Sequence, residues 1–413
     1  MKHFVAVALL VASSNGPLQG GAMFNVRDYG ARGDGQALDS PAIQKAVDAC
    51  AAAGGGTVQL GAGAYLSKPL YLHGNNLDIH LDPGAILQGT SEFADYQVHT
   101  SKAEVAGLIN ADGLSNVSIS GAGVIDGGGA PWWPAVKEAK RNGTREPRRR
   151  PKMVNFHRCE GVTIRDVTLR NSPSFHLVPV DCENVLIDHV TIKAPGDSPN
   201  TDAIDPSSCR HVHIVNCTLD VGDDNVAVKA GHPVAGRLFC CEDILVSNCA
   251  CLHGHGISIG SETSGGVSNF VVVHCTFDGT VSGLRIKTTR EKGGIVENIL
   301  YKDLTMKNVL RPIDISCYYP KIPKIDAAQA ITALTPFYRD IRIENLEGDG
   351  PGSAGLIVGL PESPVRNITL ANVHLKTTTG LLIRNAEEVE FKNVKFEVRQ
   401  GDPVITENAK VHE

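Results

Sequence analysis

A short pattern that recurs along most of the chain constrains the fold more than any other feature. It reads apolar-x-apolar-x-x-apolar and usually follows Asn or a charged residue. Copies begin at Asn116, Gly161, Asn184, His211, Asp243, Asn269, Asn298, Asp340, Asn367 and Glu388. Recurrence at intervals of about 20–45 residues is the signature of a solenoid. Alternation at period two with many Val and Ile residues indicates strands rather than helices.

The repeat therefore predicts an all-β fold, a single-stranded right-handed parallel β-helix. Each coil of such a solenoid buries its apolar face only by stacking on its neighbours, and the hand follows the right-handed crossover rule. A second set of strand-like segments lies between the repeats, at residues 256–260, 283–287 and 312–316. Each coil is thus expected to contribute at least two strands.

One short α-helix is expected before the solenoid. Ser40 is a plausible N-cap and Pro41 a plausible first residue, Ala42 to Ala53 is rich in Ala, and the glycines at 54–56 stop the helix. We expect this helix to cover the open end of the solenoid, because exposed strand edges promote aggregation.

The N-terminal residues 1–22 resemble a secretory leader, with Lys2, a short apolar run and then small residues. The alternative is a frayed apolar end of a cytosolic protein. We expect a secreted or periplasmic protein, monomeric and not membrane-bound, in which residues 23–413 form one catalytic domain. The net charge of −6 argues against a nucleic-acid partner.

The 11 cysteines are an odd number, and no pair of CxxC motifs has zinc-site spacing. Cys217, Cys249 and Cys275 occupy the same position of three successive repeats. This spacing favours an interior ladder of free thiols that behave as small hydrophobic residues. Disulfides, which an exported protein can form, and reactive thiols are the alternatives.

Polar residues recur at one position of four similar segments, each with an apolar residue in its third place. The segments are Asp202–Asp205, Asp224–Ala227, His255–Ser258 and Ser282–Arg285. If each segment is one rung of a stacked sheet, the rungs lie about 4.8 Å apart. Acids, a histidine and the cations Arg285 and Lys287 then gather on one patch. Clustered carboxylates suggest acid–base chemistry, and the neighbouring cations suggest an anionic substrate.

Four motifs in these segments resemble those of the polygalacturonases of glycoside hydrolase family 28. They are Asn200-Thr201-Asp202, Gly222-Asp223-Asp224, Gly254-His255-Gly256 and Arg285-Ile286-Lys287, in this order. The resemblance covers nearly the whole chain after the leader, including Phe24–Ala31. It implies an inverting hydrolase of α-1,4-galacturonosidic bonds in pectic polysaccharide that needs no metal or cofactor.

The resemblance also implies a role for each motif residue. Asp223 would protonate the leaving oxygen, Asp202 and Asp224 would activate water, and His255 would tune the acid. Arg285 and Lys287 would bind the substrate carboxylate.

Physical chemistry agrees with this division. Crowded carboxylates repel, so one pKa rises and that group keeps its proton. Inversion needs acid and base carboxyls about 6.5–9.5 Å apart. The alternative is an Asn/Asp ladder that only stabilises turns.

Four further residues are substrate-binding candidates. Lys229 shares the column of Lys287 and could hold a carboxylate or touch substrate, and Asn200 suits turn shaping better than chemistry. Either Tyr318 or Tyr319 could be the substrate-stacking tyrosine that the resemblance implies, with ordinary packing as the alternative.

An insertion precedes the first acidic motif. Trp132 and Trp133 in a Gly/Pro segment suggest an exposed cleft wall, and Lys137 to Lys152 is expected to be a loop inserted into one coil. A basic run in this region could steer polygalacturonate or be a solvated surface. Its members are Arg141, Arg145, Arg148, Arg149, Arg150 and Lys152.

Exo-action is favoured over endo-action because long inserted loops could close one end of the cleft. Among hydrolases, a rhamnogalacturonan or xylogalacturonan hydrolase would also fit the sequence. A Ca²⁺-dependent pectate lyase on the same fold and a non-catalytic glycan-binding β-helix are the competing hypotheses outside that class.

Overall fold

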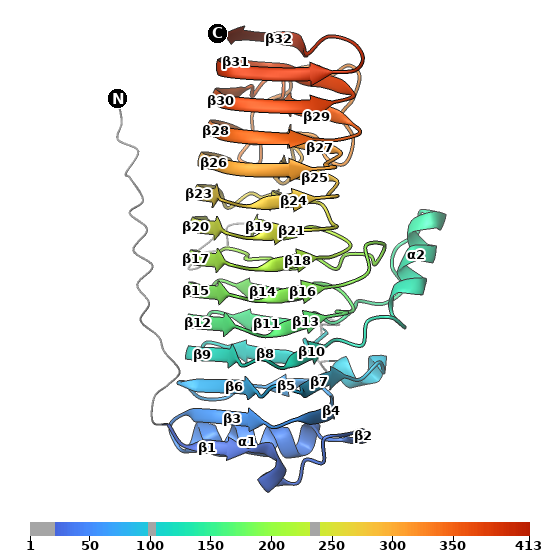
Figure 1. The fold of residues 1–413 in the computed structure, drawn as a ribbon, viewed down its shortest axis with the longest axis vertical. Coiled ribbons are helices and arrows are strands. Elements are labelled where there is room, and N and C mark those ends of the chain that lie inside the picture. Colours follow the sequence, from blue (N-terminus) through green and yellow to red (C-terminus); the bar gives the residue numbers. More distant parts are fainter. Residues whose placement is uncertain (1–20, 98–104, 232–239) are drawn as a thin grey trace.

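A computed structural model describes residues 21–97, 105–231 and 240–413, so the expected leader lies almost entirely outside the described residues. The chain winds into one elongated stack of coils, with its early coils at one end and its C-terminus at the other (Figure 1). Every pairing between successive coils is parallel. The predicted parallel β-helix is therefore confirmed.

Three stacks of strands run along the solenoid. The first contains β1 (Met23–Asn25), β3 (Gly56–Leu60), β6 (Leu77–Leu81), β9 (Ser115–Ser120), β12 (Glu160–Arg165), β15 (Glu183–Asp188), β17 (Arg210–Val215), β20 (Cys241–Ser247), β23 (Val267–Val273), β26 (Ile295–Lys307), β28 (Phe337–Asp349), β30 (Val365–Thr377), β31 (Thr379–Val398) and β32 (Val404–His412).

The second contains β2 (Asp34–Leu38), β4 (Gly63–Ser67), β7 (Ala85–Gly89), β10 (Val124–Asp126), β13 (Thr168–Arg170), β16 (Thr191–Lys193), β18 (Thr218–Asp220), β21 (Ala250–Cys251) and β24 (Thr276–Asp278), and it continues into β26.

The third contains β5 (Leu70–Tyr71), β8 (Ile109–Asp112), β11 (Val154–His157), β14 (Leu177–Val180), β19 (Val226–Ala230), β22 (Ile257–Thr263), β25 (Ser282–Lys287), β27 (Arg311–Ser316) and β29 (Ser353–Val358), and it continues into β31.

The predicted repeats form the first stack, and their apolar positions point inward. Val185 pairs with Val212, Val212 with Ile244 and Ile244 with Phe270, and all four are at most 2% exposed. Burying one such side chain is worth about 1.5–3 kcal/mol. A coil gains this free energy only where a neighbouring coil covers its apolar side chains.

Left-handed residues mark the first turn of most strands of the first stack, close to where each strand begins. They are Asn116, Asn184, His211, Asp243, Asn269, Asn298, Asp340, Asn367 and Glu388, with φ between 52° and 58°. Asn and Asp tolerate this conformation better than most residues. Other left-handed Asn residues bond to one another along a second corner, where Asn372 donates to Asn345 over 3.0 Å and Asn393 to Asn372 over 2.9 Å. An Asn/Asp ladder of the kind considered as an alternative for the acidic motifs is thus present at these corners.

The expected first helix is α1 (Ser40–Ala52), and its stripe Ile43, Ala46, Val47 and Cys50 is fully buried against the first coils (Figure 1). Ser40 is the first helical residue rather than the N-cap. Asp39 holds the cap position because its carbonyl accepts the first helical bonds, at 3.0 Å from Ala42 N and 2.9 Å from Ile43 N.

The segment expected to be a loop contains a second helix, α2 (Trp133–Asn142), so that prediction was wrong. Pro134 suits the first turn, Gly143 ends the helix at φ 64°, and the intervening residues favour helix. The many charged residues favoured the prediction of a loop, but the helix has an amphipathic face on which Trp133, Val136 and Ala139 are buried.

The two tryptophans do not form an exposed wall. Trp133 is 8% exposed, and Trp132 lies against the rings of Phe93 and Tyr96 in η2 (Phe93–Tyr96), with centroids 6.2 and 5.9 Å apart. The other 3-10 helix, η1 (Val26–Tyr29), lies in the first coil. None of the helices in the described ranges is both long and apolar enough to cross a membrane.

All 11 cysteines are free thiols, which confirms the predicted ladder of Cys217, Cys249 and Cys275. A second thiol column, which the sequence analysis missed, runs through Cys159, Cys182, Cys209 and Cys241, each directly before a strand of the first stack or at its start. Ten cysteines are buried and Cys240 is half-buried.

We predict that a thiol-reactive disulfide reagent will titrate only Cys240 rapidly in the native protein and all 11 thiols after denaturation without reductant. Burial both blocks access and disfavours the reactive thiolate. The Cys240→Ala variant is the control and should lose the rapid phase alone. Fewer than ten thiols in that denatured variant would mean that disulfides form.

Candidate active site

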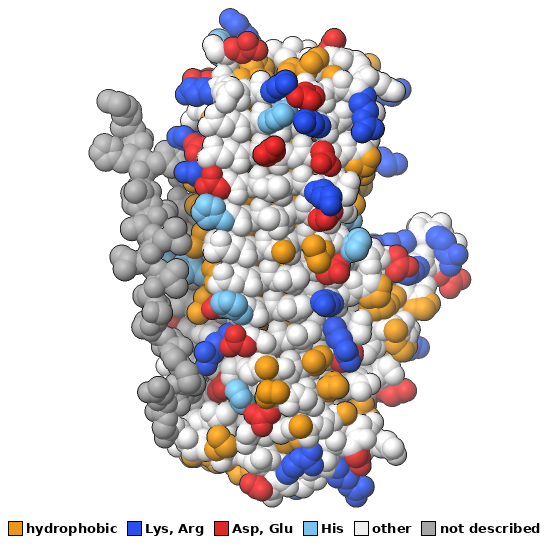
Figure 2. All heavy atoms as spheres, in the orientation of Figure 1, with side chains coloured by type: hydrophobic (Ala, Val, Ile, Leu, Met, Phe, Trp, Pro, Cys, Tyr) orange, Lys and Arg blue, Asp and Glu red, His pale blue; other side chains and the backbone are white. Residues whose placement is uncertain are grey.

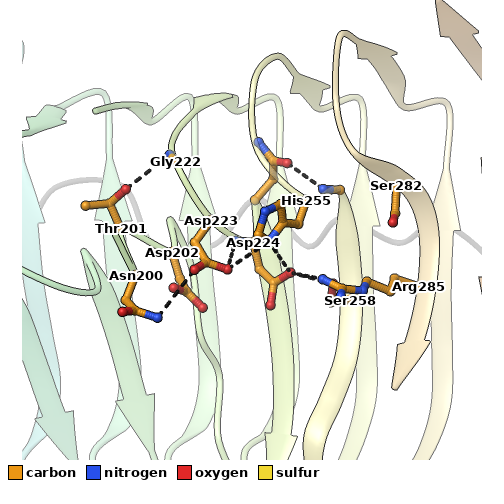
Figure 3. Close-up of polar contacts among 12 residues, drawn as sticks. Asn200, Thr201, Asp202, Gly222, Asp223, Asp224, His255, Ser258, Ser282 and Arg285 are labelled. Atoms are coloured by element: carbon orange, nitrogen blue, oxygen red, sulfur yellow. Dashed lines mark hydrogen bonds and ion pairs between the residues drawn. The ribbon is translucent and has the colours of Figure 1, made fainter. Parts of the chain in front are cut away.

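The third stack brings the four polar segments together. Ile204 bridges to Val226, Val226 pairs with Ile257, and Ile257 pairs with Leu284. The third residues of the four segments therefore form one buried column, as the similarity of the segments predicts. Figure 3 shows Asp202, Asp223, Asp224 and His255 converging on neighbouring coils, with Arg285 beside them.

Close backbone packing forms the turns that carry these side chains. Gly254 has φ 119°, and a Cβ there would lie 2.5 Å from the carbonyl oxygen of Asp223. That same carbonyl accepts a hydrogen bond from the His255 backbone N–H at 2.9 Å. Asn225 fastens the turn from inside, because its Oδ1 accepts from Gly256 N at 2.8 Å and its Nδ2 donates to the His253 carbonyl at 2.9 Å.

Asp223 pairs with His255 at the mouth of the cluster. Its Oδ1 lies 2.9 Å from Nδ1 of His255, and its Oδ2 accepts from Asn200 Nδ2 at 3.4 Å. Burial opposes ionisation of Asp223, but the hydrogen bond and charge of His255, with the charges of Lys287 and Lys140, outweigh it and lower the pKa to about 2. Asp223 is therefore a carboxylate in this structure.

Asp224 is enclosed by donors. Lys287 Nζ lies 2.6 Å from Oδ2, while Ser258 Oγ and Arg285 Nη1 lie 2.8 and 3.3 Å from Oδ1. Burial favours the neutral acid, yet the charges of Lys287 and Arg285 lower the Asp224 pKa below its usual value. This carboxylate stays ionised although its side chain is only 2% exposed.

Asp202 shares a second charge cluster with Asp205 and Lys229. Lys229 Nζ lies 3.2 Å from Asp205 Oδ2 and 3.9 Å from Asp202 Oδ2. Burial, then repulsion from Asp205 and Asp223, raises the pKa of Asp202 well above its usual value. Burial also raises the pKa of Asp205 to about 6, although Lys229 opposes the rise.

This distribution of protons differs from the one expected from sequence. Crowding raises a carboxyl pKa, as predicted, but the affected groups are Asp202 and Asp205 rather than Asp223. The reason is the placement of the cations. His255 and Lys287 act on Asp223, whereas Lys229 is divided between two acids.

The structure separates the two tyrosine candidates. Tyr319 is 39% exposed, and its ring lies beside both motif cations, 5.7 Å from Arg285 Cζ and 5.2 Å from Lys287 Nζ. Tyr318 instead donates its hydroxyl to Asp326 at 2.5 Å and lies under Arg290. Tyr319 is therefore the tyrosine that faces the site.

Asn200 and Arg150 form a support behind Asp223. Asn200 has φ 53°, which agrees with turn shaping, and its Oδ1 accepts from Arg150 Nη2 at 3.0 Å. Arg150 Nη1 also donates to the carbonyls of Pro173 and Pro199 at 2.8 and 2.6 Å. With a side chain that is 5% exposed, Arg150 is unsuited to the steering role considered for the basic run.

Sequence reasoning missed three supporting residues, Arg150, Asp205 and His176. Asp205 had a signal, since it occupies the fourth position of the first polar segment. His176 is fully buried, and its Nδ1 lies 3.0 Å from the Asp202 carbonyl oxygen. Burial lowers its pKa to about 4, so it is neutral at pH 7. The contact between His176 and Asp202 joins two separate coils, so no local sequence pattern indicates it.

A cleft of about 720 Å³ opens onto this cluster. One wall is α2, and the others carry the residues of the acidic turns; its lining is Pro134, Lys137, Lys140, Arg141, Asp197, Ser198, Pro199, Gly222, Asp223 and His255. His253 pairs with Asp220 at 2.8 Å and does not line this cleft, as expected for a structural residue.

Asp223, Asp224 and His255 are the described group best placed to hold a metal ion, with ligand atoms within 4.8 Å of one another. The positive charges of Lys287 and Arg285 on Asp224 would repel a cation there. The arrangement suits proton transfer and the binding of an anion better than the binding of a metal.

Comparison with known proteins agrees with this site and fold. The model of the family described as glycosyl hydrolases family 28 matches residues 50–404. An endo-polygalacturonase of Pectobacterium carotovorum subsp. carotovorum is 31% identical over 367 residues, which cover 83% of this chain and 85% of that protein.

Two solved structures are similar at 27% identity. A hyperthermoactive exopolygalacturonase from Thermotoga maritima has a TM-score of 0.73, with 94% of this chain and 92% of that chain covered. A polygalacturonase from Erwinia carotovora ssp. carotovora has a TM-score of 0.71, with 97% and 99% covered.

We predict that Lys229→Met will destabilise the fold by about 3–5 kcal/mol at pH 7, because it leaves buried carboxylates without a counter-charge. A carboxyl whose pKa is higher folded than unfolded holds its proton more tightly in the native state. Without Lys229 the Asp205 pKa should rise further above 6, so the loss should be largest at alkaline pH and shrink as the pH falls towards about 6. Denaturant unfolding at several pH values measures both effects.

The double variant Lys229→Met/Asp205→Asn is the matched control and should regain part of the stability at pH 7. An equal loss at every pH would show that packing, rather than charge, explains the effect of Lys229→Met.

Proposed function

This chain belongs to glycosyl hydrolases family 28, and we propose that it hydrolyses α-1,4-galacturonosidic bonds in polygalacturonate and related pectic polymers. The observation that carries the proposal is the placement of Arg285 and Lys287, two nearly buried cations, beside the Asp202, Asp223 and Asp224 cluster. Arg recognises a carboxylate through two parallel hydrogen bonds and Lys acts as a point charge. A uronate bound there would place its glycosidic bond next to Asp223.

Asp223 is the proposed general acid. It lines the cleft and is the most exposed carboxyl of the three, at 17% for its side chain, against 5% for Asp202 and 2% for Asp224. Because the pKa of Asp223 is about 2, its proton must come from another group, and Nδ1 of His255 lies 2.9 Å away, in position to share one.

Substrate binding would bring that proton to Asp223. A uronate on Arg285 and Lys287 cancels part of the positive charge that holds Asp223 ionised, and a sugar in the cleft removes water. Both changes raise the Asp223 pKa, so the proton shared with His255 moves to the carboxyl and then to the leaving oxygen.

Asp202 and Asp224 are the proposed bases that orient and activate water. Asp202 Oδ1 is buried and has no hydrogen-bond partner among the described residues, so a water molecule held beside it would supply the missing donor. Attack by that water from the face opposite the leaving group would invert the anomeric centre.

Exo-action is the finer part of the proposal. Helix α2 stands away from the solenoid beside the turns that follow β16 and β18, and it forms one wall of the cleft (Figure 1). A wall on one side of Asp223 limits how far a polymer can extend in that direction. Similar proteins include both an endo-polygalacturonase and an exopolygalacturonase, so product analysis must decide.

We also propose that the protein is exported. The leader-like residues 1–22 support this, as does a polymeric substrate that cells encounter outside the membrane.

We predict that the purified protein will release reducing ends from polygalacturonate in the presence of EDTA, without absorbance from unsaturated uronides. Exo-action predicts one short product from the earliest time points, and a ladder of oligomers at early times would contradict it. Calcium-dependent absorbance would instead identify a lyase.

The Asp223→Asn variant should lower kcat by about 10²–10⁴-fold and keep its thermal stability.

We further predict that the acidic limb of the kcat/KM profile lies well above pH 3.8, because Asp202 must be ionised to act as a base and its pKa is raised. Asp205→Asn removes a repelling charge, so the Asp202 pKa should fall and the limb should move to lower pH. Asp188→Asn, at a corner of the first stack, is the control and should leave the limb in place. An unmoved limb in Asp205→Asn would exclude Asp202 as the titrating base.

A further inference from the structure

Helix α2 carries a row of cations that the proposed mechanism does not use. Lys137, Lys140 and Arg141 are spaced i, i+3 and i+4, so they share one face of the helix. Lys137 Nζ lies 2.5 Å from Asp197 Oδ2. Lys140 and Arg141 are exposed, and their side chains have no hydrogen-bond or ion-pair partner within the described ranges. Figure 2 shows the Lys and Arg side chains on this projecting segment.

The helix is anchored at its start, and the chain that follows it is tied back to the solenoid, which distinguishes it from a solvated loop. At its start Trp133 is buried and donates from Nε1 to the Ser172 carbonyl at 3.2 Å. After the helix, Arg150 ties the returning chain to the carbonyls of Pro173 and Pro199. The cations of α2 therefore stand in a defined position relative to the acidic turns.

These cations face the same cleft as the reacting groups. Lys140 and Arg141 line it together with Asp223 and His255, and the volume of about 720 Å³ is within the range of roughly 300–1,000 Å³ usual for ligand sites. Lys140 is close enough for its charge to help lower the pKa of Asp223. Arg285 and Lys287 belong to later coils and do not line this part of the cleft.

We propose that Lys140 and Arg141 form a second carboxylate subsite, which binds an acidic sugar of the substrate on the side of Asp223 away from Arg285 and Lys287. This inference rests on the proposed function and adds to it a requirement for acidic residues on both sides of the cleaved bond. Like charges spaced i, i+3 or i+4 on a helix repel each other, and a bound carboxylate would relieve the repulsion between Lys137 and its two neighbours.

An alternative role for Lys140 and Arg141 is to stabilise α2 itself, since cations near a helix C-terminus are favourable. That role predicts a change in stability alone. A subsite predicts a change in substrate affinity that depends on the charge of the substrate and on salt.

The test compares the wild-type protein with Lys140→Gln/Arg141→Gln, because Gln preserves helix propensity. The control is Lys45→Gln, which removes an exposed lysine from α1 at the far end of the solenoid. KM and kcat are measured on short and long oligogalacturonides at low and high salt, together with the melting temperature.

A subsite predicts a rise in KM of about five- to tenfold on long oligogalacturonides at low salt, with kcat nearly unchanged and the wild-type advantage reduced at high salt. The control should match the wild type. An unchanged KM in the double variant, or a loss confined to thermal stability, would overturn the inference while the proposed hydrolysis stands. A wild-type protein that cleaves no galacturonide would overturn both.

Discussion

Parallel pairing between successive coils is the interaction on which the rest of this structure depends. Each coil buries its inward side chains only against the coils above and below, and the pairing register decides which side chains those are. Ile204, Val226, Ile257 and Leu284 are all fully buried in one column of the third stack. The polar residues around that column are therefore positioned by core packing, since a slip of one residue would turn the column outward.

Charge compensation is the second constraint, and it divides the site in two. Asp223 and Asp224 lie among His255, Arg285 and Lys287, and their pKa values fall. Asp202 and Asp205 are buried and share the cation Lys229, and their pKa values rise. Neighbouring carboxyls thus differ in proton affinity although they are chemically alike, and such differences allow one site to supply both an acid and a base.

Sequence reasoning succeeded where a signal repeats and failed where a contact is local to one insertion. The repeats predicted the solenoid and the thiol ladder because each recurs at a fixed position, and helix start and stop signals predicted α1. The α2 segment occurs once and is rich in charge, so its buried face of Trp133, Val136 and Ala139 was hidden. Arg150 was grouped with the surface cations of the same run, yet it crosses to Pro173, Pro199 and Asn200 on other coils.

The amino-acid order alone determined the parallel solenoid, the register of its polar segments and the identity of the acids, the histidine and the cations that meet there. Periodic patterning contains that information, because a stacked sheet converts equal sequence positions into neighbouring ones. Folding in three dimensions decided which carboxyls hold protons, which tyrosine lies beside Arg285 and Lys287, and that a basic helix lines the cleft. These outcomes depend on distances and burial between segments far apart in the chain, and a linear pattern does not contain them.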